Sequence, residues 1–129
     1  LSDYEEGLHV TTATPSGSGT VTLNSSADTM AYTKIGRTVL ITGETSISSV
    51  SSPTGSVLDF TVPFACSSLS ELSERAGGGV FWTEAGVSLP FHVLPFLTFS
   101  GSIIRIFKDA SAFSAGDSIT FGVSYLTDS

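Results

Sequence analysis

Turn-forming residues interrupt this chain about every ten residues, and the segments between them are rich in Val, Ile, Thr and Phe. This rhythm is typical of short antiparallel strands, because β-branched and aromatic side chains fit a pleated, half-buried surface. The pattern predicts nine strands: Leu8–Thr14, Thr20–Asn24, Met30–Ile35, Thr38–Ile47, Ser56–Val62, Val80–Thr83, Ser88–Phe99 with a break at Pro95, Ser102–Phe107 and Ser118–Leu126.

A chain of 129 residues with this many strands is expected to form one all-β domain, residues 1–129. We expect an antiparallel two-sheet β-sandwich with a jelly-roll-like topology, in which one face of each sheet packs against the other. One segment, Ser67–Arg75, has Leu69 and Leu72 at helical spacing and could make two turns before the glycines at 77–79.

Charge and cysteine content exclude several classes of protein. A net charge of -7, with five scattered Lys and Arg residues, argues against binding to the phosphates of a nucleic acid. The longest apolar stretch, Ser88–Phe99, is short and contains two prolines, so no membrane-spanning segment is expected. The single cysteine, Cys66, cannot close an internal disulfide, and we interpret it as a small buried hydrophobe.

The segment Val87–Phe107 is apolar on both faces of its predicted strands. A strand buried on both faces needs a cover on each, and in a two-layer sandwich the second cover is either another part of the chain or another subunit. The second alternative makes these residues candidates for an oligomer interface: Phe91, Val93, Leu94, Phe96, Ile104 and Ile106.

Catalytic constellations are absent from the sequence. Glu5 and Glu6 are adjacent on an extended segment, so their side chains point to opposite sides and cannot flank one glycosidic bond. The chain has no Gly-x-Ser-x-Gly motif, and only His9 and His92 could serve as a base. Neither histidine has a second ligand at motif spacing, so we expect a non-enzyme with no metal and no cofactor, in which each histidine is a hydrogen-bonded strand residue.

The remaining chemistry is ligand binding, for which Trp82 is the best candidate. Sugars bind to aromatic faces and a few polar groups, and Thr83 and Glu84 follow this only tryptophan at a strand end. Alternatively, a lone tryptophan in a sandwich is a core residue. The loop Cys66–Gly79 adds Glu71 and Glu74 to the candidate site, and its glycines would let backbone approach a ligand. Further candidates are Tyr32, Tyr125, Phe113 and the loop Asp109–Gly116.

Three motifs occur in order along the chain: Asp-Tyr-Glu-Glu-Gly at 3–7, Tyr-Thr-Lys-Ile-Gly-Arg-Thr-Val at 32–39, and Phe-Gly-Val-Ser-Tyr-Leu-Thr-Asp at 121–128. In this order they resemble the C-terminal, receptor-binding domain of tailed-bacteriophage tail fibres and related virion appendages, over nearly the whole chain. Two positions depart from that family. His9 stands where the family usually has tryptophan, and Ala31 where arginine is frequent.

The resemblance implies a domain on the virion, cut from a longer protein, that binds a bacterial surface receptor, either a glycan or a protein, as a homotrimer. Three identical weak sites on one rigid tip would raise avidity through effective concentration. Two other functions remain open from the sequence. One is a structural head-fibre or decoration domain without a receptor, and the other is an enzyme that trims surface polysaccharide.

Overall fold

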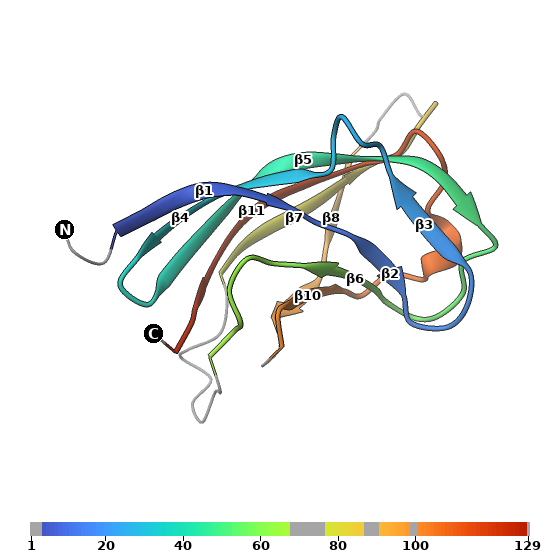
Figure 1. The fold of residues 1–129 in the computed structure, drawn as a ribbon. Helices are drawn as coiled ribbons and strands as arrows, with labels where there is room; N and C mark the ends of the chain where they lie inside the picture. The colour runs from blue at the N-terminus through green and yellow to red at the C-terminus, as the bar shows by residue number, and fades with distance from the viewer. Residues whose placement is uncertain (1–3, 68–76, 87–90, 99–100, 129) are drawn as a thin grey trace.

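The computed structural model describes residues 4–67, 77–86, 91–98 and 101–128 of the chain, and it consists of two antiparallel β-sheets packed face to face (Figure 1). The larger sheet has the strand order β1 (Tyr4–Val10), β4 (Thr29–Ile35), β5 (Thr38–Ser51), β11 (Ser118–Leu126), β7 (Gly77–Thr83) and β8 (Phe91–Leu94), with β3 (Thr20–Leu23) paired to the second half of β5. The smaller sheet has the order β2 (Ala13–Pro15), β6 (Leu58–Thr61), β10 (Ile103–Ile106) and β9 (Phe96–Thr98).

This architecture confirms the predicted all-β sandwich, whereas the jelly-roll topology stays a prediction. The last strand was predicted to the residue, and several others to within a few residues of their ends. The candidate helix at Ser67–Arg75 falls almost wholly outside the described residues. In the part of the chain that is described, no helix is long and apolar enough to cross a membrane.

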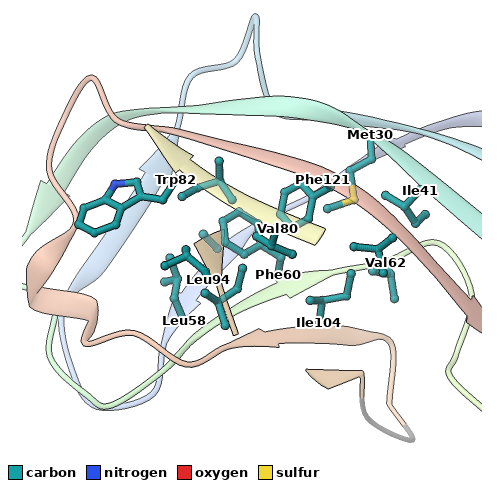
Figure 2. Packing of buried hydrophobic residues seen from close by; sticks show 14 of the residues in the cluster. Met30, Ile41, Leu58, Phe60, Val62, Val80, Trp82, Leu94, Ile104 and Phe121 are labelled. Atoms are coloured by element: carbon teal, nitrogen blue, oxygen red, sulfur yellow. The ribbon is translucent and has the colours of Figure 1, made fainter. Parts of the chain in front are cut away.

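The core lies between the two sheets and follows the alternation of the strands. On β11, every second residue from Ile119 to Tyr125 is buried, and the residues between them face away from the smaller sheet. The Phe121 ring meets the Phe60 ring of β6 edge to face, with centroids 5.1 Å apart, so this pair joins the two sheets (Figure 2). Cys66 is buried in the same core, as expected for a small hydrophobe.

Two predicted strands are each divided where the chain crosses from one sheet to the other. The run Leu8–Thr14 separates into β1 in the larger sheet and β2 in the smaller one. The run Ser88–Phe99 breaks at Pro95, as predicted, and β8 and β9 then belong to different sheets. Leu94 before the crossing and Phe96 after it both pack against the shared core, although they belong to different sheets.

Glycine is favoured at two places, at Gly36 by the backbone conformation and at Gly78 by the lack of room for a side chain. Gly36 opens the two-residue turn between β4 and β5 with φ of +59°, which suits a hairpin turn with glycine at its first central position. Gly78 lies so close to β11 that an added Cβ would stand 2.0 Å from the carbonyl oxygen of Gly122. The glycines at 77–79 therefore begin β7 against a neighbouring strand, although the sequence suggested an approach to a ligand.

Candidate functional site

The structure places Trp82 in the core, so the prediction of an exposed sugar platform is wrong. Only 4% of the residue is exposed, and Trp82 belongs to the buried cluster (Figure 2). Its ring packs against that of Phe113 with centroids 5.0 Å apart. The Trp82 Nε1 group donates a hydrogen bond to Asp117 Oδ2 at 3.0 Å. Trp82 is an inward-facing residue of β7, and its polar edge is satisfied inside the protein.

Asp117 organises this corner of the sandwich. It is 2% exposed, and its carboxylate accepts three hydrogen bonds, from Trp82 Nε1, from the Ala85 backbone N–H at 2.9 Å and from the Ser114 backbone N–H at 2.9 Å. The side chain thereby connects the end of β7 to the loop before β11. The loop Asp109–Gly116, an alternative binding loop from the sequence, is thus held to the core at its end, and Phe113 within it is buried.

The accessible groups at this corner are those around Trp82. Glu84 Oε2 accepts a hydrogen bond from His92 Nε2 at 3.4 Å, and both side chains are partly exposed. Lys108 Nζ lies 5.5 Å from the Trp82 ring centroid, a distance compatible with a cation–π interaction. The corner therefore offers a carboxylate, an imidazole and an ammonium group as ligand contacts, together with Thr83 on the outer face of β7. The other predicted residues, Glu71 and Glu74, lie outside the described residues.

The predicted interface residues are divided between the core and the surface. Leu94, Ile104 and Ile106 are buried within this chain, where a second subunit does not reach them. Phe96 is partly buried against the same core, and Val93 is 69% exposed. The backbone of Phe91 begins β8, while its side chain lies outside the described part. The chain's own core thus covers Leu94, Ile104 and Ile106, whereas Val93 is left uncovered.

The outer face of the larger sheet carries exposed apolar residues, of which the sequence predicted only Val93 as an interface residue. On β1 the structure turns His9 inward and leaves Leu8 and Val10 exposed by 75% and 63%. Register places Tyr4 beside Ile35, Leu8 beside Ala31, and Thr33 beside Leu40 on this face. Its large exposed hydrophobic residues, which we call the outer apolar face, are Tyr4, Leu8, Val10, Ile35, Leu40 and Val93.

Tyr4 on β1 and Tyr32 on the neighbouring strand β4 each donate a hydrogen bond to a carboxylate. Tyr4 donates to Glu6 at 2.5 Å and Tyr32 donates to Glu5 at 3.2 Å. The bond to Glu6 raises the pKa of Tyr4, and partial desolvation followed by the bond to Glu5 raises the pKa of Tyr32. Both tyrosines therefore stay protonated donors at neutral pH.

Tyr32 also meets the Phe64 ring edge to face at 5.2 Å, so the Tyr32 candidate is a partly buried packing residue. Tyr125, another candidate from the sequence, is a core residue whose hydroxyl donates to the Phe64 carbonyl oxygen at 2.9 Å.

Both histidines are strand residues with a hydrogen-bond partner, as the sequence predicted. His9 Nε2 lies 3.1 Å from Thr61 Oγ1 and so connects β1 to β6 of the smaller sheet, while His92 contacts Glu84. Desolvation lowers the pKa of His9, and the interaction with Thr61 opposes that shift only in part. Within the described ranges, no three His, Cys, Asp or Glu side chains gather in a group that could hold a metal ion.

A cleft lies where β1 passes into β2 beside β3, and its volume is about 290 Å³. Its walls come from Val10 and Thr12 on one side and from Val21, Thr22 and Leu23 on the other, with Asp28 also in contact. A second, shallower hollow of about 350 Å³ lies over β1 and β4 between Glu6 and Thr33. Neither cleft could be predicted from the sequence, because each is formed by segments from different strands.

No protein-family profile and no curated protein matches the sequence of this chain. Among solved structures, the fold is similar to part of the Dettilon tailspike protein (gp208), with a TM-score of 0.58 and 20% sequence identity. The match covers 95% of this chain and 23% of the tailspike chain, so this chain spans about a quarter of that protein's length. At this identity the likeness is one of fold.

Proposed function

We propose that this chain is an attachment domain of a bacteriophage tail appendage, that it acts as a homotrimer, and that it binds a glycan on the bacterial surface. The fold likeness to a tailspike protein over 95% of the chain carries this proposal. The motifs at 3–7, 32–39 and 121–128 add independent support, since they resemble the tail-fibre family in the same order. The proposal includes a longer virion protein to which this domain belongs.

The outer apolar face supports self-association. On the described part of this face, Glu6 and Glu44 are the only charged residues among those alternating outward, although the chain carries a net charge of -7. Depletion of charge and enrichment of large apolar side chains are features of the centre of a subunit interface. Five residues of the face, Tyr4, Leu8, Val10, Ile35 and Leu40, lie on the neighbouring strands β1, β4 and β5, while Val93 lies on β8 at the other edge of the sheet. Large exposed apolar patches mark interaction sites in soluble proteins.

The size of the face is also adequate. Six strands spaced by about 4.8 Å and about seven residues long give a face of roughly 29 Å by 23 Å, on the order of 650 Å². A specific interface buries about 800 Å² on each partner, so the face, with a modest rim around it, is large enough. The proposed interface therefore moves from the 87–107 segment to the outer apolar face, where Val93 belongs to both.

Sedimentation equilibrium of the chain tests self-association, and we expect three times the 13.3 kDa chain mass. Leu8→Glu should shift the protein toward monomer, because it places a charge at the most exposed large apolar residue of the face without disturbing the core. Ser111→Glu adds the same charge at an exposed position of the 3-10 turn Ala110–Ala112 and should leave the assembly unchanged. A monomer at micromolar concentration for the unaltered chain would contradict the homotrimer.

Adsorption to host cells tests attachment. Fluorescently labelled chain should bind to the host cells, compete with intact phage and lose most of its binding in the Leu8→Glu variant, because three linked sites raise avidity. Chain that self-associates but does not bind cells or isolated surface polysaccharide would favour the structural virion domain. Release of reducing sugar from that polysaccharide would instead reveal the trimming enzyme.

A further inference from the structure

The cleft beside β3 is held open by hydrogen bonds on both of its sides. Thr11, which is almost fully buried, donates through its hydroxyl to the Thr61 carbonyl oxygen at 2.8 Å and through its backbone N–H to the Asp28 carbonyl oxygen at 2.8 Å. On the opposite side, the turn at 24–28 is tied to β5, since Asn24 N–H donates to the Ser46 carbonyl oxygen at 2.8 Å. The cleft is therefore formed before any ligand arrives, as binding sites for small molecules usually are.

The polar groups that line this cleft are largely available. Asp28 Oδ1 accepts one long bond, 3.3 Å, from the neighbouring Thr29 hydroxyl, and Asp28 Oδ2 accepts none from the residues that the structure describes. The hydroxyls of Thr12 and Thr22 likewise bond to no other described side chain or backbone group, and both residues are exposed. The cleft is thus lined by one carboxylate and two hydroxyls that are available to a ligand.

The apolar part of the lining is aliphatic. Val21 is buried beneath the cleft, Leu23 is partly buried and Val10 is highly exposed at its rim. Aliphatic side chains of this kind can pack against the C–H groups of a sugar ring, while the carboxylate accepts hydrogen bonds from its hydroxyls. Among the described residues that line the cleft, Asp28 is the only ionisable one, so its carboxylate disfavours an acidic sugar.

We propose that this cleft binds one neutral hexose unit of a host surface glycan, with Asp28 accepting hydrogen bonds from adjacent sugar hydroxyls and Thr12 and Thr22 completing the polar contacts. The inference rests on the proposed attachment function and assigns it a site and a ligand class. A volume of about 290 Å³ holds a ligand at the small end of the usual range. A single small ligand binds weakly, on the order of 1 to 10 mM, and three linked copies would supply the avidity.

The test is an NMR titration of the ¹⁵N-labelled chain with glucose, galactose and mannose separately, and with glucuronate as the acidic counterpart. We expect amide shifts at Thr12, Thr22 and Leu23 with at least one neutral hexose, and shifts at least tenfold weaker with glucuronate at equal concentration. Asp28→Asn should weaken the binding about tenfold or more, because hydrogen bonds to an ionised acceptor are the stronger ones. Thr22→Val should weaken it severalfold.

Asp109→Asn removes the same charge from an exposed residue outside the cleft and should leave the titration unchanged. Absence of shifts with all three hexoses, shifts that Asp28→Asn does not alter, or equal binding of glucuronate would overturn the proposal. Should Asp28→Asn not fold, Thr22→Val decides the location. Cell attachment without hexose binding would refute the hexose site in the cleft but not the attachment function. Hexose binding without cell attachment would refute the attachment function but not the hexose site.

Discussion

Asp117 is a single residue on which a corner of this fold depends, and its replacement should be costly. Three buried or partly buried N–H groups donate to its carboxylate, and Asp117→Ala would leave all three without an acceptor. An unsatisfied buried donor costs about 1 to 3 kcal/mol. Water can reach the Ala85 and Ser114 groups, which are only partly buried, whereas the Trp82 bond is buried. We therefore expect a loss of about 3 to 5 kcal/mol in the free energy of unfolding.

Asp117→Asn separates the loss of charge from the loss of the acceptor. With its carbonyl oxygen turned to the Oδ2 position, the amide still accepts from Trp82 and Ser114, and only the Ala85 N–H loses its partner. The expected cost is about 1 to 2 kcal/mol. Asp109→Asn, at an exposed residue without a side-chain cap bond, should change stability by less than about 0.5 kcal/mol.

Denaturation in urea, followed by fluorescence, measures these differences directly, because Trp82 is the only tryptophan in the chain. Circular dichroism on the same samples reports unfolding independently of the altered indole environment. The order of stability should be native, then Asp117→Asn, then Asp117→Ala. A loss below about 1 kcal/mol for Asp117→Ala would refute the view that this carboxylate holds the corner together.

Two other predictions follow from the core and from its titratable residue. Phe121→Ala should lower the free energy of unfolding by about 3 to 5 kcal/mol, because it opens a cavity opposite Phe60. Ser51→Ala, at an exposed position, should change it by almost nothing. Thermal melts that reversed this order would contradict the strand register. Desolvation lowers the pKa of His9 in the folded chain. As the pH drops below about 6.5, this histidine is therefore protonated in the unfolded chain before it is protonated in the folded chain. The free energy of unfolding should fall over this range until the folded histidine is protonated as well. His9→Gln should flatten this slope in urea melts between about pH 7.5 and pH 5, and an unchanged slope would assign the effect to other groups.

Much of the fold could be predicted from local patterns. The alternation from Ile119 to Tyr125 marks one buried face of β11, and the glycine at 36 marks the turn before β5. These features depend on neighbours within a few residues, which the sequence displays directly. The all-β class follows from the same local signals.

The points where the chain crosses from one sheet to the other could not be predicted from local patterns. A run such as Ser88–Phe99 looks like one strand with two apolar faces, but Pro95 divides it into two strands that face one core from opposite sides. Only the arrangement of the sheets shows this. The role of Trp82 is similar, because its partner Asp117 lies 35 residues further along the chain. The sequence left core and platform as alternatives for Trp82, and the buried carboxylate decides between them.

The cleft and the outer apolar face meet at Val10, which lines the first and is exposed on the second. β1 therefore has two proposed functions, each assigned to a different part of its surface. Leu8, toward the middle of the strand, would contact another copy, while Val10 at its end borders the Asp28 side chain. A trimer formed through this face would hold three clefts at fixed separations, so that a repetitive surface glycan could occupy more than one at a time. The two faces of β1 would then serve different contacts. Its inward residue His9 bonds to Thr61 of the smaller sheet, and its outward apolar residues would contact partners.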